Sequence, residues 1–594
     1  MTHAVEGTRH VDMGALPGHV ATLSALQKIL VVLACVFAPM IAHTIKPSTT
    51  ILNQVASLVT WGLFAAVFMG SLGRRTVSMG RAGVLISALA LLLLGVLGSY
   101  SFAFLPLPMT LATTGGLLAA MLLVYVGIMA RQAGYTTSLM GAVSLGWIVL
   151  GLLSFLVGCV QAFVPSLVGN EWIAATSFPG RAVGNLRQPN QLATILLWAS
   201  VGLVWMNEMG RLRRVSLGVL LAAFTFGVVL SGSRTGQFGV LVLAVWAVLD
   251  RRLAPTSRSA LMWNPAVMAV AWVGLSVWAR FSEQILGATA RVGEGLGSSR
   301  FGVWVSAWEM IRQYPLTGVG WGSFNLAWTF TPNANRLVEV FDHAHSLPLQ
   351  LMAELGLPLG LLLVLLLCLA LKRAFSESGK VAGPEGTALR CSFMMVLLVG
   401  IHSLMEYPLW FIYFLLPTAL LWGLCLGSRR GAEVSTTRPE PVNAGVLKLS
   451  GVLLVVIGIA TLADFMRVAW IYARKEVDLP LIERIERAQG SWLFAPQADF
   501  AFATNYPPGE AALAASKRAA PRLADLVLLR AWAMSLYATG DVERARYVAE
   551  RLREFQHEDF FPWFAECDAA PTPGQPKPFQ CTPPTKTFTY RDML

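Results

Sequence analysis

The sequence predicts an all-α, polytopic membrane protein that carries a helical domain at its C-terminal end. Hydrophobic residues make up 55% of its 594 residues and charged residues only 13%, and the mean hydropathy is +0.60. A soluble protein of this size needs more polar surface than this composition supplies. Apolar runs of about 20 residues, long enough to cross a bilayer as helices, recur from Leu26 to Phe465.

These apolar runs predict about thirteen transmembrane helices. The short run 236–249 and the run interrupted by Pro408 carry the weakest signals. The expected spans are 26–43, 51–72, 82–100, 111–130, 140–164, 190–208, 215–231, 236–249, 261–279, 346–371, 390–406, 408–427 and 446–465.

Basic residues predict the side of the membrane on which each loop lies. Dense Arg and Lys clusters occur in alternate short loops, among them Arg74–Arg81, Arg211–Arg214 and Arg251–Arg258. Because short loops rich in Arg and Lys stay in the cytoplasm, we expect these loops and the polar tail 1–25 on the cytoplasmic side. An odd number of spans then places residues 466–594 on the opposite side, which is the periplasm for a bacterial inner membrane.

The net charge of +12 does not indicate a nucleic-acid partner. The basic residues are scattered in short clusters between apolar runs and form no continuous polar face. The expected partner is the lipid bilayer. The sequence has no C-x-x-C pair and no D-x-D pair on a predicted external loop, so we expect neither a metal site nor a cofactor.

The change in composition near residue 465 predicts two domains. Residues 26–465 form the transmembrane domain, which includes a long external loop at 280–345, whereas residues 466–594 are charged and helical. Residues 531–549 predict two helices joined by a Gly-Asp turn. This pattern resembles one tetratricopeptide (TPR) hairpin, and it equally fits a plain helical hairpin.

Two cysteines, Cys567 and Cys581, lie in the polar C-terminal part. An oxidising periplasm allows a disulfide between them, and we favour this pairing. The alternative is two free thiols.

Unusual polar residues of the membrane region collect at the predicted outer face. Arg187 and Gln191 lie in a polar segment at the start of the sixth span, and Arg234 lies in Ser231–Gly236 between two apolar spans. An arginine fork binds phosphate oxygens bidentately, and a tight turn of hydroxyls and N–H groups can bind an anion. The alternatives are an interfacial arginine for Arg187 and a surface charge for Arg234.

Arg300 follows Ser298 and Ser299, either of which can cap a helix. Arg300 then lies in the first turn, where free N–H groups and the helix dipole attract phosphate. Trp304 follows on the same face, where its ring either stacks on a sugar or rests in the membrane interface. The segment predicts a phosphate site.

His345 stands at the start of the tenth span. A neutral imidazole can take a proton from a hydroxyl nucleophile, and His343 is the alternative base. A capping histidine is the structural alternative. Glu354 lies inside the apolar helix that follows, where a carboxylate is costly and marks either a function or a polar network.

His402 and Glu406 are four residues apart at the outer end of the eleventh span, so we expect them on one face of a helix. Glu406 would then orient His402 for catalysis by a hydrogen bond. A purely structural pair is an equally good interpretation.

Together these groups suit transfer from a lipid-linked diphosphate. Arginines bind the pyrophosphate oxygens and stabilise charge on the leaving group, while a histidine activates the acceptor hydroxyl. A diphosphate leaving group needs no metal ion when arginines take that role.

With these motifs in this order, the sequence resembles the O-antigen ligase/polymerase superfamily. The resemblance rests on the late segments His343–Gln350 (HAHSLPLQ) and Glu354–Gly356 (ELG), on the long loop before them and on the helical C-terminal extension. Within the superfamily, Arg187–Ala193 (RQPNQLA) and His402–Trp410 (HSLMEYPLW) are similar to the pilin O-oligosaccharyltransferases of the PglL type. The resemblance covers nearly the whole chain.

The resemblance implies a glycosyltransferase that moves an oligosaccharide from undecaprenyl diphosphate to Ser or Thr of a pilin-like exported protein. The implied transfer takes place on the periplasmic face, needs no metal and inverts the sugar. The functional histidine of the family falls on His345, and its arginines fall on Arg234 and Arg300. Ser346 stands where many relatives have Asn, which leaves the acceptor class open.

Three other functions compete with this interpretation. An O-antigen ligase would use the lipid A-core of lipopolysaccharide as acceptor, and a polymerase would use another glycan. The helical C-terminal domain favours a protein acceptor. A transporter of lipid-linked sugars would hold its polar site near the midplane, often between repeated halves, whereas here the polar groups lie at the outer face without an internal repeat.

Overall fold

The computed structural model describes most of the chain. Most of the predicted tail 1–25, and residues 282–298 of the predicted external loop, lie outside the described residues. The described residues are 21–72, 75–77, 79–102, 105–176, 178, 180–281, 299–333, 336–428, 440–442, 444–473, 479–568 and 577–594.

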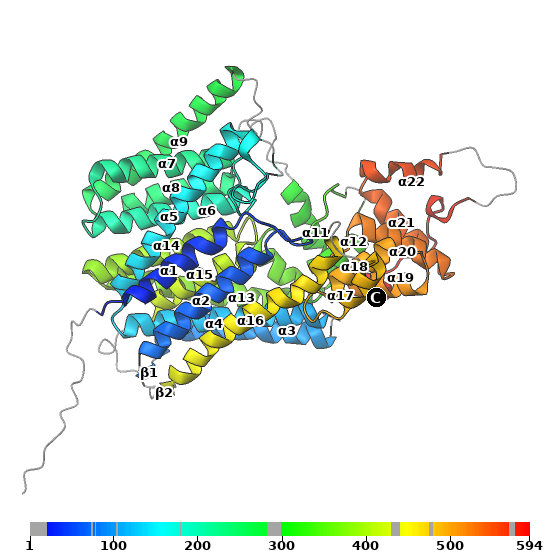
Figure 1. Ribbon diagram of the computed structural model, residues 1–594, viewed down its shortest axis with the longest axis horizontal. Helices are drawn as coiled ribbons and strands as arrows, with labels where there is room; N and C mark the ends of the chain where they lie inside the picture. Colours follow the sequence, from blue (N-terminus) through cyan, green and yellow to red (C-terminus); the bar gives the residue numbers. More distant parts are fainter. Residues whose placement is uncertain are drawn as a thin grey trace, which may run out of the picture.

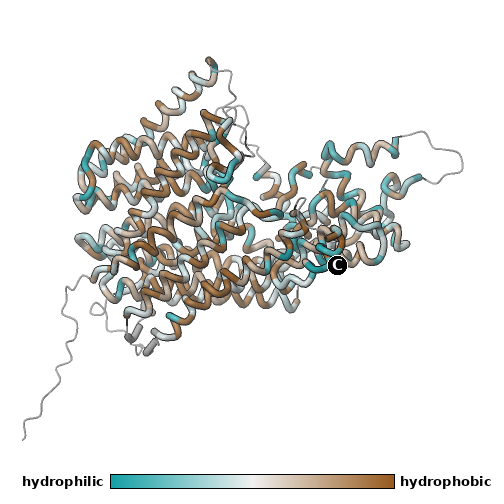
Figure 2. Tube along the Cα trace, in the orientation of Figure 1, coloured by the Kyte–Doolittle hydropathy of each residue, from teal (hydrophilic) through white to brown (hydrophobic). Residues whose placement is uncertain are grey.

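The membrane region is a bundle of helices, and the C-terminal helices gather at one end of it (Figure 1). Figure 2 shows that the bundle helices are mostly hydrophobic, with hydrophilic residues near their ends. Each of the thirteen predicted spans overlaps a helix, with differences at the ends. These helices are α1 (Ala25–Met40), α2 (Ile51–Ser71), α3 (Gly83–Phe102), α4 (Leu107–Gln132), α5 (Thr136–Phe163), α6 (Pro189–Glu208), α7 (Arg214–Ser231), α8 (Arg234–Leu249), α9 (Pro255–Phe281), α13 (Leu347–Lys380), α14 (Gly383–His402), α15 (Ile412–Leu426) and α16 (Ala444–Ala469).

Within the described residues, nine helices are long and apolar enough to cross a membrane. α1, α8 and α15 are shorter apolar helices of 16, 16 and 15 residues. α6 packs against α5, α7 and α14 and is buried on nearly all sides, which allows it to carry polar residues at its first turns. The protein is therefore a multi-pass membrane protein.

α4 and α15 cross so closely that each has a glycine at the contact. A Cβ atom at Gly127 would overlap the backbone oxygen of Leu420, and a Cβ atom at Gly423 would overlap that of Val124. Small residues allow helix backbones in a membrane to approach and pack by van der Waals contact. This contact fixes α15, and with it the turn that precedes α15, against the bundle.

α13 is broken near its N-terminal end, at Gly356. This residue has a φ of 77°, in the left-handed region that glycine adopts without strain. The backbone N–H groups of Val319 and Gly320 donate to the carbonyls of Ala353 and Glu354, both at 2.9 Å. The carbonyls freed by the break are thus paired, and the first turns of α13 are held against the loop before them.

Two short strands join two loops at the end of the bundle away from the C-terminal helices (Figure 1). β1 (Arg75–Val77) pairs antiparallel with β2 (Glu440–Val442). Both loops are rich in arginine, and the sequence predicts that such loops lie on the same side of the membrane. The all-helical prediction holds for the described residues apart from this ribbon.

The C-terminal domain consists of short helices beside the end of α16. Its hairpin is joined by Gly540, which has a φ of 87°, and the side chain of Asp541 caps the second helix by accepting from the Arg544 N–H. The two-helix prediction for 531–549 is therefore confirmed. The helices are α17 (Leu481–Gln489), α18 (Ala495–Asn505), α19 (Glu510–Ala519), α20 (Leu526–Ala538), α21 (Val542–Glu554), α22 (Phe561–Ala565) and α23 (Tyr590–Met593).

The predicted external loop folds against the C-terminal domain. Its helices α11 (Ser299–Gln313) and α12 (Phe324–Phe330) contribute to the same buried cluster as α20 and α21. The ring of Phe330 meets that of Trp532 edge-on, with centroids 5.2 Å apart. Residues far apart in sequence therefore share one hydrophobic core beyond the membrane bundle.

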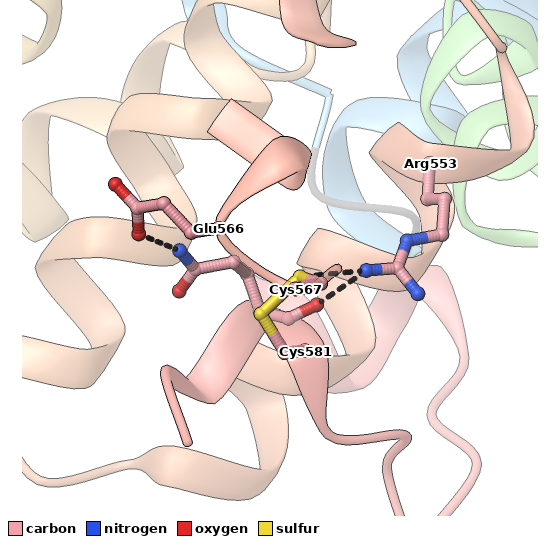
Figure 3. The surroundings of a disulfide bond; sticks show 5 residues. Arg553, Glu566, Cys567 and Cys581 are labelled. Atoms are coloured by element: carbon pink, nitrogen blue, oxygen red, sulfur yellow. Dashed lines mark hydrogen bonds between the residues drawn. A yellow bond between two sulfur atoms is a disulfide. The ribbon is translucent and has the colours of Figure 1, made fainter. Parts of the chain in front are cut away.

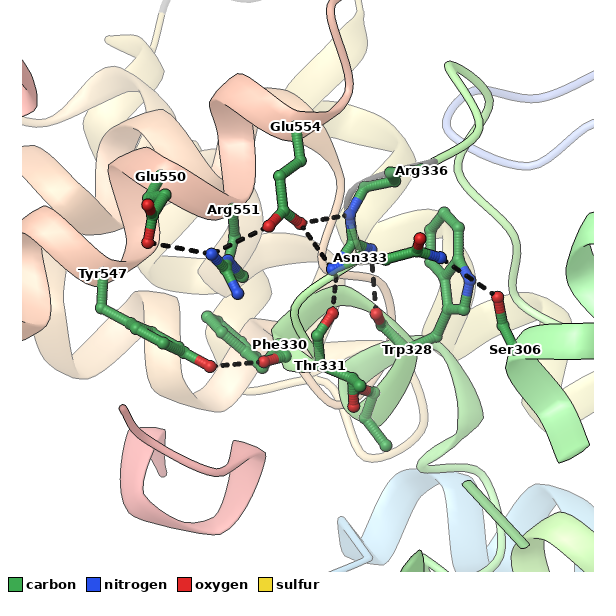
Figure 4. Close-up of polar contacts among 11 residues, drawn as sticks. Ser306, Trp328, Phe330, Thr331, Asn333, Arg336, Tyr547, Glu550, Arg551 and Glu554 are labelled. Atoms are coloured by element: carbon green, nitrogen blue, oxygen red, sulfur yellow. Dashed lines mark hydrogen bonds and ion pairs between the residues drawn. The ribbon is translucent and has the colours of Figure 1, made fainter. Parts of the chain in front are cut away.

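A buried ion pair connects the loop after α12 to α21 (Figure 4). Arg336, whose side chain is 0% exposed, donates from Nε to Glu554 Oε2 at 2.9 Å and from Nη1 to the carbonyl of Trp328 at 2.9 Å. Its guanidinium also lies 4.9 Å from the ring centroids of Trp328 and Phe555. Arg551 contacts the other oxygen of Glu554 at 2.8 Å.

The predicted disulfide between Cys567 and Cys581 is present (Figure 3). Arg553 donates to the carbonyl of Gln580 at 3.1 Å, and the amide of Gln580 donates to Glu566 at 3.1 Å. The cross-link and these hydrogen bonds hold the last part of the chain beside α21 and α22.

We expect Arg336→Met to loosen the C-terminal domain, because it removes one partner of a buried ion pair. Such a loss costs about 3 kcal/mol, or roughly a hundredfold faster amide exchange in α21. Hydrogen–deuterium exchange with peptide-level mass spectrometry measures this effect. The matched control is Arg546→Met, which breaks a partly exposed pair with Glu543 on the same helix and should change protection by less than about fivefold. Equal protection in both variants would contradict a structural role for the buried pair.

Candidate active site

The carboxylate of Glu406 is the centre of a polar cluster at the end of the bundle that faces the C-terminal domain. Its Oε1 accepts a hydrogen bond from Asn190 Nδ2 at 2.9 Å and pairs with Arg300, and its Oε2 lies 2.7 Å from His345 Nδ1. The Glu406 side chain is only 8% exposed. A carboxylate this buried needs such partners to remain charged.

These contacts determine the protonation of Glu406 and the hydrogen-bond direction at His345. Burial raises the pKa of Glu406, but the hydrogen bond from His345 and the charge of Arg300 outweigh burial and lower it below its ordinary value. Glu406 is thus ionised at neutral pH and can only accept. His345 Nδ1 therefore carries the proton in the 2.7 Å bond, and Nε2 is the ring nitrogen that can accept a proton when the imidazole is neutral.

The sequence predicts that Glu406 pairs with His402. This prediction is wrong, because α14 ends at His402. The chain turns away there, and the four-residue spacing no longer places the two side chains on one helix face. His402 Nδ1 lies instead 2.8 Å from Thr194 Oγ1. The Thr194 hydroxyl donates to the carbonyl of Asn190, so it accepts from His402.

His345 is held in a strained backbone conformation. Its φ is 50°, in the left-handed region, which costs a residue other than glycine about 1–3 kcal/mol. The backbone on either side is fixed: the Ala344 N–H donates to Gln350 Oε1 at 2.6 Å, and the Leu347 N–H donates to the carbonyl of Ser403 at 2.7 Å. Strain of this kind persists only where surrounding contacts impose it, and it is common at functional sites.

An aromatic cluster adjoins the two histidines. Tyr407 stacks on His343, with centroids 4.3 Å apart, and meets His345 edge-on at 5.0 Å. Trp410 lies edge-on to His343 at 5.0 Å and stacks on Trp321 at 5.8 Å. These rings position both imidazoles from one side.

His343 pairs with its neighbour Asp342, 2.9 Å from Nδ1 to Oδ1. Burial lowers the pKa of His343, but the charge of Asp342 and the contact with it outweigh burial and raise the pKa above its ordinary value. Burial likewise raises the pKa of Asp342, and the charge of His343 brings it down to about 2. His343 therefore favours the protonated form, which makes it a weaker candidate for a general base than His345.

The Arg234 turn joins the cluster through its serine. Gly232 has a φ of 60°, and Ser233 caps α8 by accepting from the Gly236 N–H at 3.0 Å. The Ser233 hydroxyl donates to Asn190 Oδ1 at 2.5 Å, and Asn190 in turn binds Glu406. Arg234 is exposed at the first residue of α8, beside this chain of hydrogen bonds.

Arg187 lies at the same end of the bundle and binds backbone. It also has a positive φ, of 61°. Its Nη1 donates to the carbonyl of Thr49 at 2.8 Å, and its Nη2 binds the carbonyl of Ala42. Burial lowers the pKa of Arg187. The described contacts thus tie Arg187 to the α1–α2 loop, and they give no support for the predicted role in binding diphosphate.

Gln350 and Glu354 hold two loops against α13. Glu354 is 2% exposed, and its Oε1 accepts from the backbone N–H groups of Gly322 at 2.9 Å and Phe324 at 3.3 Å. Gln350 binds the N–H of Ala344 between the two histidines. Glu354 therefore caps the N-terminus of α12, and this structural role explains its burial in an apolar helix.

α11 begins at Ser299, so Arg300 lies in the first turn as predicted. Trp304 stands one turn later, and its indole Nε1 is buried without a hydrogen-bond partner among the described residues. A buried N–H group without a partner costs free energy. Trp304 thus offers a donor beside Arg300.

A small cavity of about 30 Å³ lies behind Glu406, large enough for one or two water molecules. Gln191, a predicted binding residue, lines this cavity with His402 and Tyr407. Gln191 also accepts a hydrogen bond from the Tyr413 hydroxyl at 3.0 Å. Among the described residues, no group of three or more His, Cys, Asp or Glu side chains could hold a metal ion.

Several residues of the cluster are not singled out by the sequence. Asn190 and Ser233 lie inside the segments of interest, but their neighbours Arg187 and Arg234 carry the more conspicuous charge. The signal for Asn190 is its place at the start of the predicted span 190–208, after a proline and before a long apolar run. In the structure it is the second residue of α6. The stacking role of Tyr407 follows from tertiary contact alone.

We expect Asp342→Asn to lower the pKa of His343, because the variant loses the negative charge that favours the imidazolium. Because the pKa of His343 is raised in the folded state, the pair of Asp342 and His343 stabilises the fold fully at a pH below 6.5, the ordinary pKa of histidine. This stabilisation is lost as the pH rises through the raised pKa. NMR titration of histidine-labelled protein measures the shift, with His343→Gln to assign the signal. An unchanged pKa in Asp342→Asn would show that the pair does not control this histidine.

Comparison with known proteins supports the family resemblance. Residues 217–364 match the model described as O-antigen ligase, residues 392–565 match the C-terminal part of virulence factor membrane-bound polymerase, and residues 182–206 match protein glycosylation ligase. Asn190 lies in the matched segment 182–206, and Glu406 lies in the matched segment 392–565.

Two curated proteins of Acinetobacter baylyi are similar to this chain. A general O-oligosaccharyltransferase is 27% identical over 311 residues, which are 50% of this chain and 51% of the relative. A ComP-specific O-oligosaccharyltransferase is 26% identical over 278 residues, 47% of this chain and 49% of the relative. The chain thus spans about half the length of the curated relatives it matches. Residues 217–364 of the membrane region are similar to the O-antigen ligase family, and both relatives are O-oligosaccharyltransferases.

Proposed function

We propose that this protein transfers an oligosaccharide from undecaprenyl diphosphate to Ser or Thr of a pilin-like exported protein. Transfer takes place at the periplasmic face of a bacterial inner membrane, with the N-terminus in the cytoplasm and the C-terminal domain, residues 466–594, in the periplasm. The observation that carries the proposal is the Glu406 cluster, which brings a histidine and an arginine together at the face where the C-terminal domain lies.

His345 is the general base of the proposed reaction. Glu406 holds the Nδ1 proton, so Nε2 accepts the proton of the acceptor hydroxyl. The acceptor oxygen then attacks the anomeric carbon, and the bond between that carbon and the phosphate oxygen breaks. The leaving diphosphate keeps the electron pair, and a single displacement inverts the configuration of the sugar.

Arg300 and Arg234 bind the diphosphate in this proposal. Arg300 uses part of its guanidinium on Glu406 and has further N–H donors for phosphate oxygens. Arg234 is exposed at the first turn of α8, where free N–H groups and the helix dipole favour an anion. These cations stabilise the charge of the leaving group, so the reaction requires no metal ion.

A protein acceptor is the preferred acceptor class. The C-terminal domain and the loop helices α11 and α12 share one core, so a polypeptide bound on these helices lies next to Arg300. The names of the two relatives agree with this class. The runner-up functions are an O-antigen ligase and a polymerase, because residues 217–364 and 392–565 match models with those descriptions.

We expect His345→Ala to reduce glycan transfer by at least about a hundredfold, the usual contribution of a general base. The assay co-expresses a pilin with this protein in a glycosylation-negative cell that supplies a lipid-linked glycan, and the mass of the intact pilin reports transfer. Glu406→Gln should show a smaller loss, since it keeps the side-chain volume but removes the charge that orients His345. His557→Ala, a histidine in the C-terminal domain with a side chain 32% exposed, is the control.

Wild-type transfer to pilin that vanishes in His345→Ala would support the proposal. Glycan on lipid A-core in place of pilin would make the protein a ligase, and longer lipid-linked chains would make it a polymerase. Full activity in His345→Ala, at equal membrane expression, would rule out this histidine as the base.

We also expect the purified protein to transfer glycan at an undiminished rate after treatment with excess EDTA, within about twofold, because arginines take the place of a metal ion. The rate is measured with lipid-linked glycan and pilin in detergent. Loss of activity that Mg²⁺ or Mn²⁺ restores would contradict the assignment of Arg234 and Arg300.

A further inference from the structure

A second pocket lies away from the Glu406 cluster, where α16 meets α17. Its volume is about 370 Å³. α16 supplies the apolar lining residues Ala463 and Met466, and Trp470, just after α16, and Leu479 supply two more. Figure 1 shows that α16, a membrane helix, ends beside the helices of the C-terminal domain.

Three arginines line the same pocket, and no acidic side chain lines it among the residues that the structure describes. Arg467 and Arg487 are exposed, with 51% and 66% of their side chains accessible. Arg484 is partly buried and donates from Nη1 to the carbonyls of Trp470 and Ala473, both at 3.0 Å. It therefore joins the end of α16 to α17.

The acidic neighbours of these arginines are only loosely paired with them. Glu483 lies 3.9 Å from Arg487, and Asp464 lies 3.9 Å from Arg467. Asp464 is 5% exposed and already accepts hydrogen bonds from the hydroxyl of Ser491 and the N–H of Leu493. Arg467 also donates from Nη1 to the carbonyl of Gly490 at 3.2 Å. Each guanidinium has five N–H donors, so Arg467 and Arg487 have further donors for an anion in the pocket.

A lipid-facing stripe of α16 leads directly into this pocket. Val452, Val456 and Ile459 are 42%, 54% and 60% exposed, and the pocket residues Met466 and Trp470 continue the same spacing of three and four residues. Buried residues of α16 pack on α2, where Gly451 and Gly458 lie at the contact. The exposed stripe therefore faces the acyl chains of the bilayer over the length of the helix.

We propose that this pocket binds the phosphate of a membrane glycerophospholipid, whose acyl chain lies along the α16 stripe. Arg467 and Arg487 pair with the phosphate, and Trp470 lies at the level of the headgroup, where tryptophan is favoured. Since Arg484 joins the pocket to α17, a bound lipid fixes the C-terminal domain at the membrane surface. The proposal is independent of the glycan chemistry.

Native mass spectrometry of the delipidated full chain in detergent tests this site. The probes are dioctanoyl phosphatidylglycerol, which has both phosphate and acyl chains, dioctanoylglycerol, which lacks the phosphate, and inorganic phosphate. We expect one saturable phosphatidylglycerol per chain, and about tenfold weaker binding when Arg467→Gln and Arg487→Gln are combined. The double variant Arg467→Lys, Arg487→Lys keeps the charges and should bind within about threefold of wild type.

The matched control combines Arg530→Gln and Arg546→Gln, which remove two arginines from α20 and α21 and should leave binding unchanged. Equal affinity for phosphatidylglycerol in wild type and the glutamine variant would overturn the proposal. Equally tight binding of dioctanoylglycerol would reduce the site to an apolar groove. Displacement of phosphatidylglycerol by inorganic phosphate at equal concentration would show a free-anion site without a lipid.

Discussion

The ionised carboxylate of Glu406 makes the contacts on which the arrangement of this end of the bundle depends. A buried charge is tolerated only when it is paired, and Glu406 finds its partners in Asn190, Arg300 and His345. These partners come from the start of α6, the start of α11 and the loop before α13. The cluster can therefore form only when the bundle, the loop helices and the turn after α14 have all reached their final positions.

The C-terminal domain takes part in this constraint. α11 carries Arg300, and it packs into the core that the domain shares with α12. Arg336 and Glu554 tie the following loop to α21, and the hydroxyl of Tyr590 donates to the carbonyl of Val319 at 2.8 Å. The domain thus supports the segment that carries an arginine of the proposed site, in addition to any surface it offers an acceptor.

The sequence predicts the helices well because a bilayer demands long apolar runs, and it locates the polar residues at one face because charge is costly elsewhere. It fails where tertiary contact decides. The pairing of His402 with Glu406 assumes a helix to residue 406, but α14 ends at His402 and the chain turns before Pro408. The carbonyl partners of Arg187 lie about 140 positions earlier in the chain, and no spacing rule reveals them.

His402 and His345, which both lie beside Glu406, differ in the chemistry open to them. His402 is 1% exposed, and its Nδ1 is hydrogen-bonded to Thr194 within the bundle, which is typical of a structural residue. His345 has a side chain 17% exposed, has no hydrogen-bond partner at Nε2 among the residues that the structure describes, and stands on a strained backbone that its neighbours impose. A network that served packing alone would gain nothing from that strain, since a residue with negative φ could fill the space. The strain is explained if the imidazole must reach both Glu406 and an acceptor hydroxyl, and this is the physical ground for assigning His345 as the base.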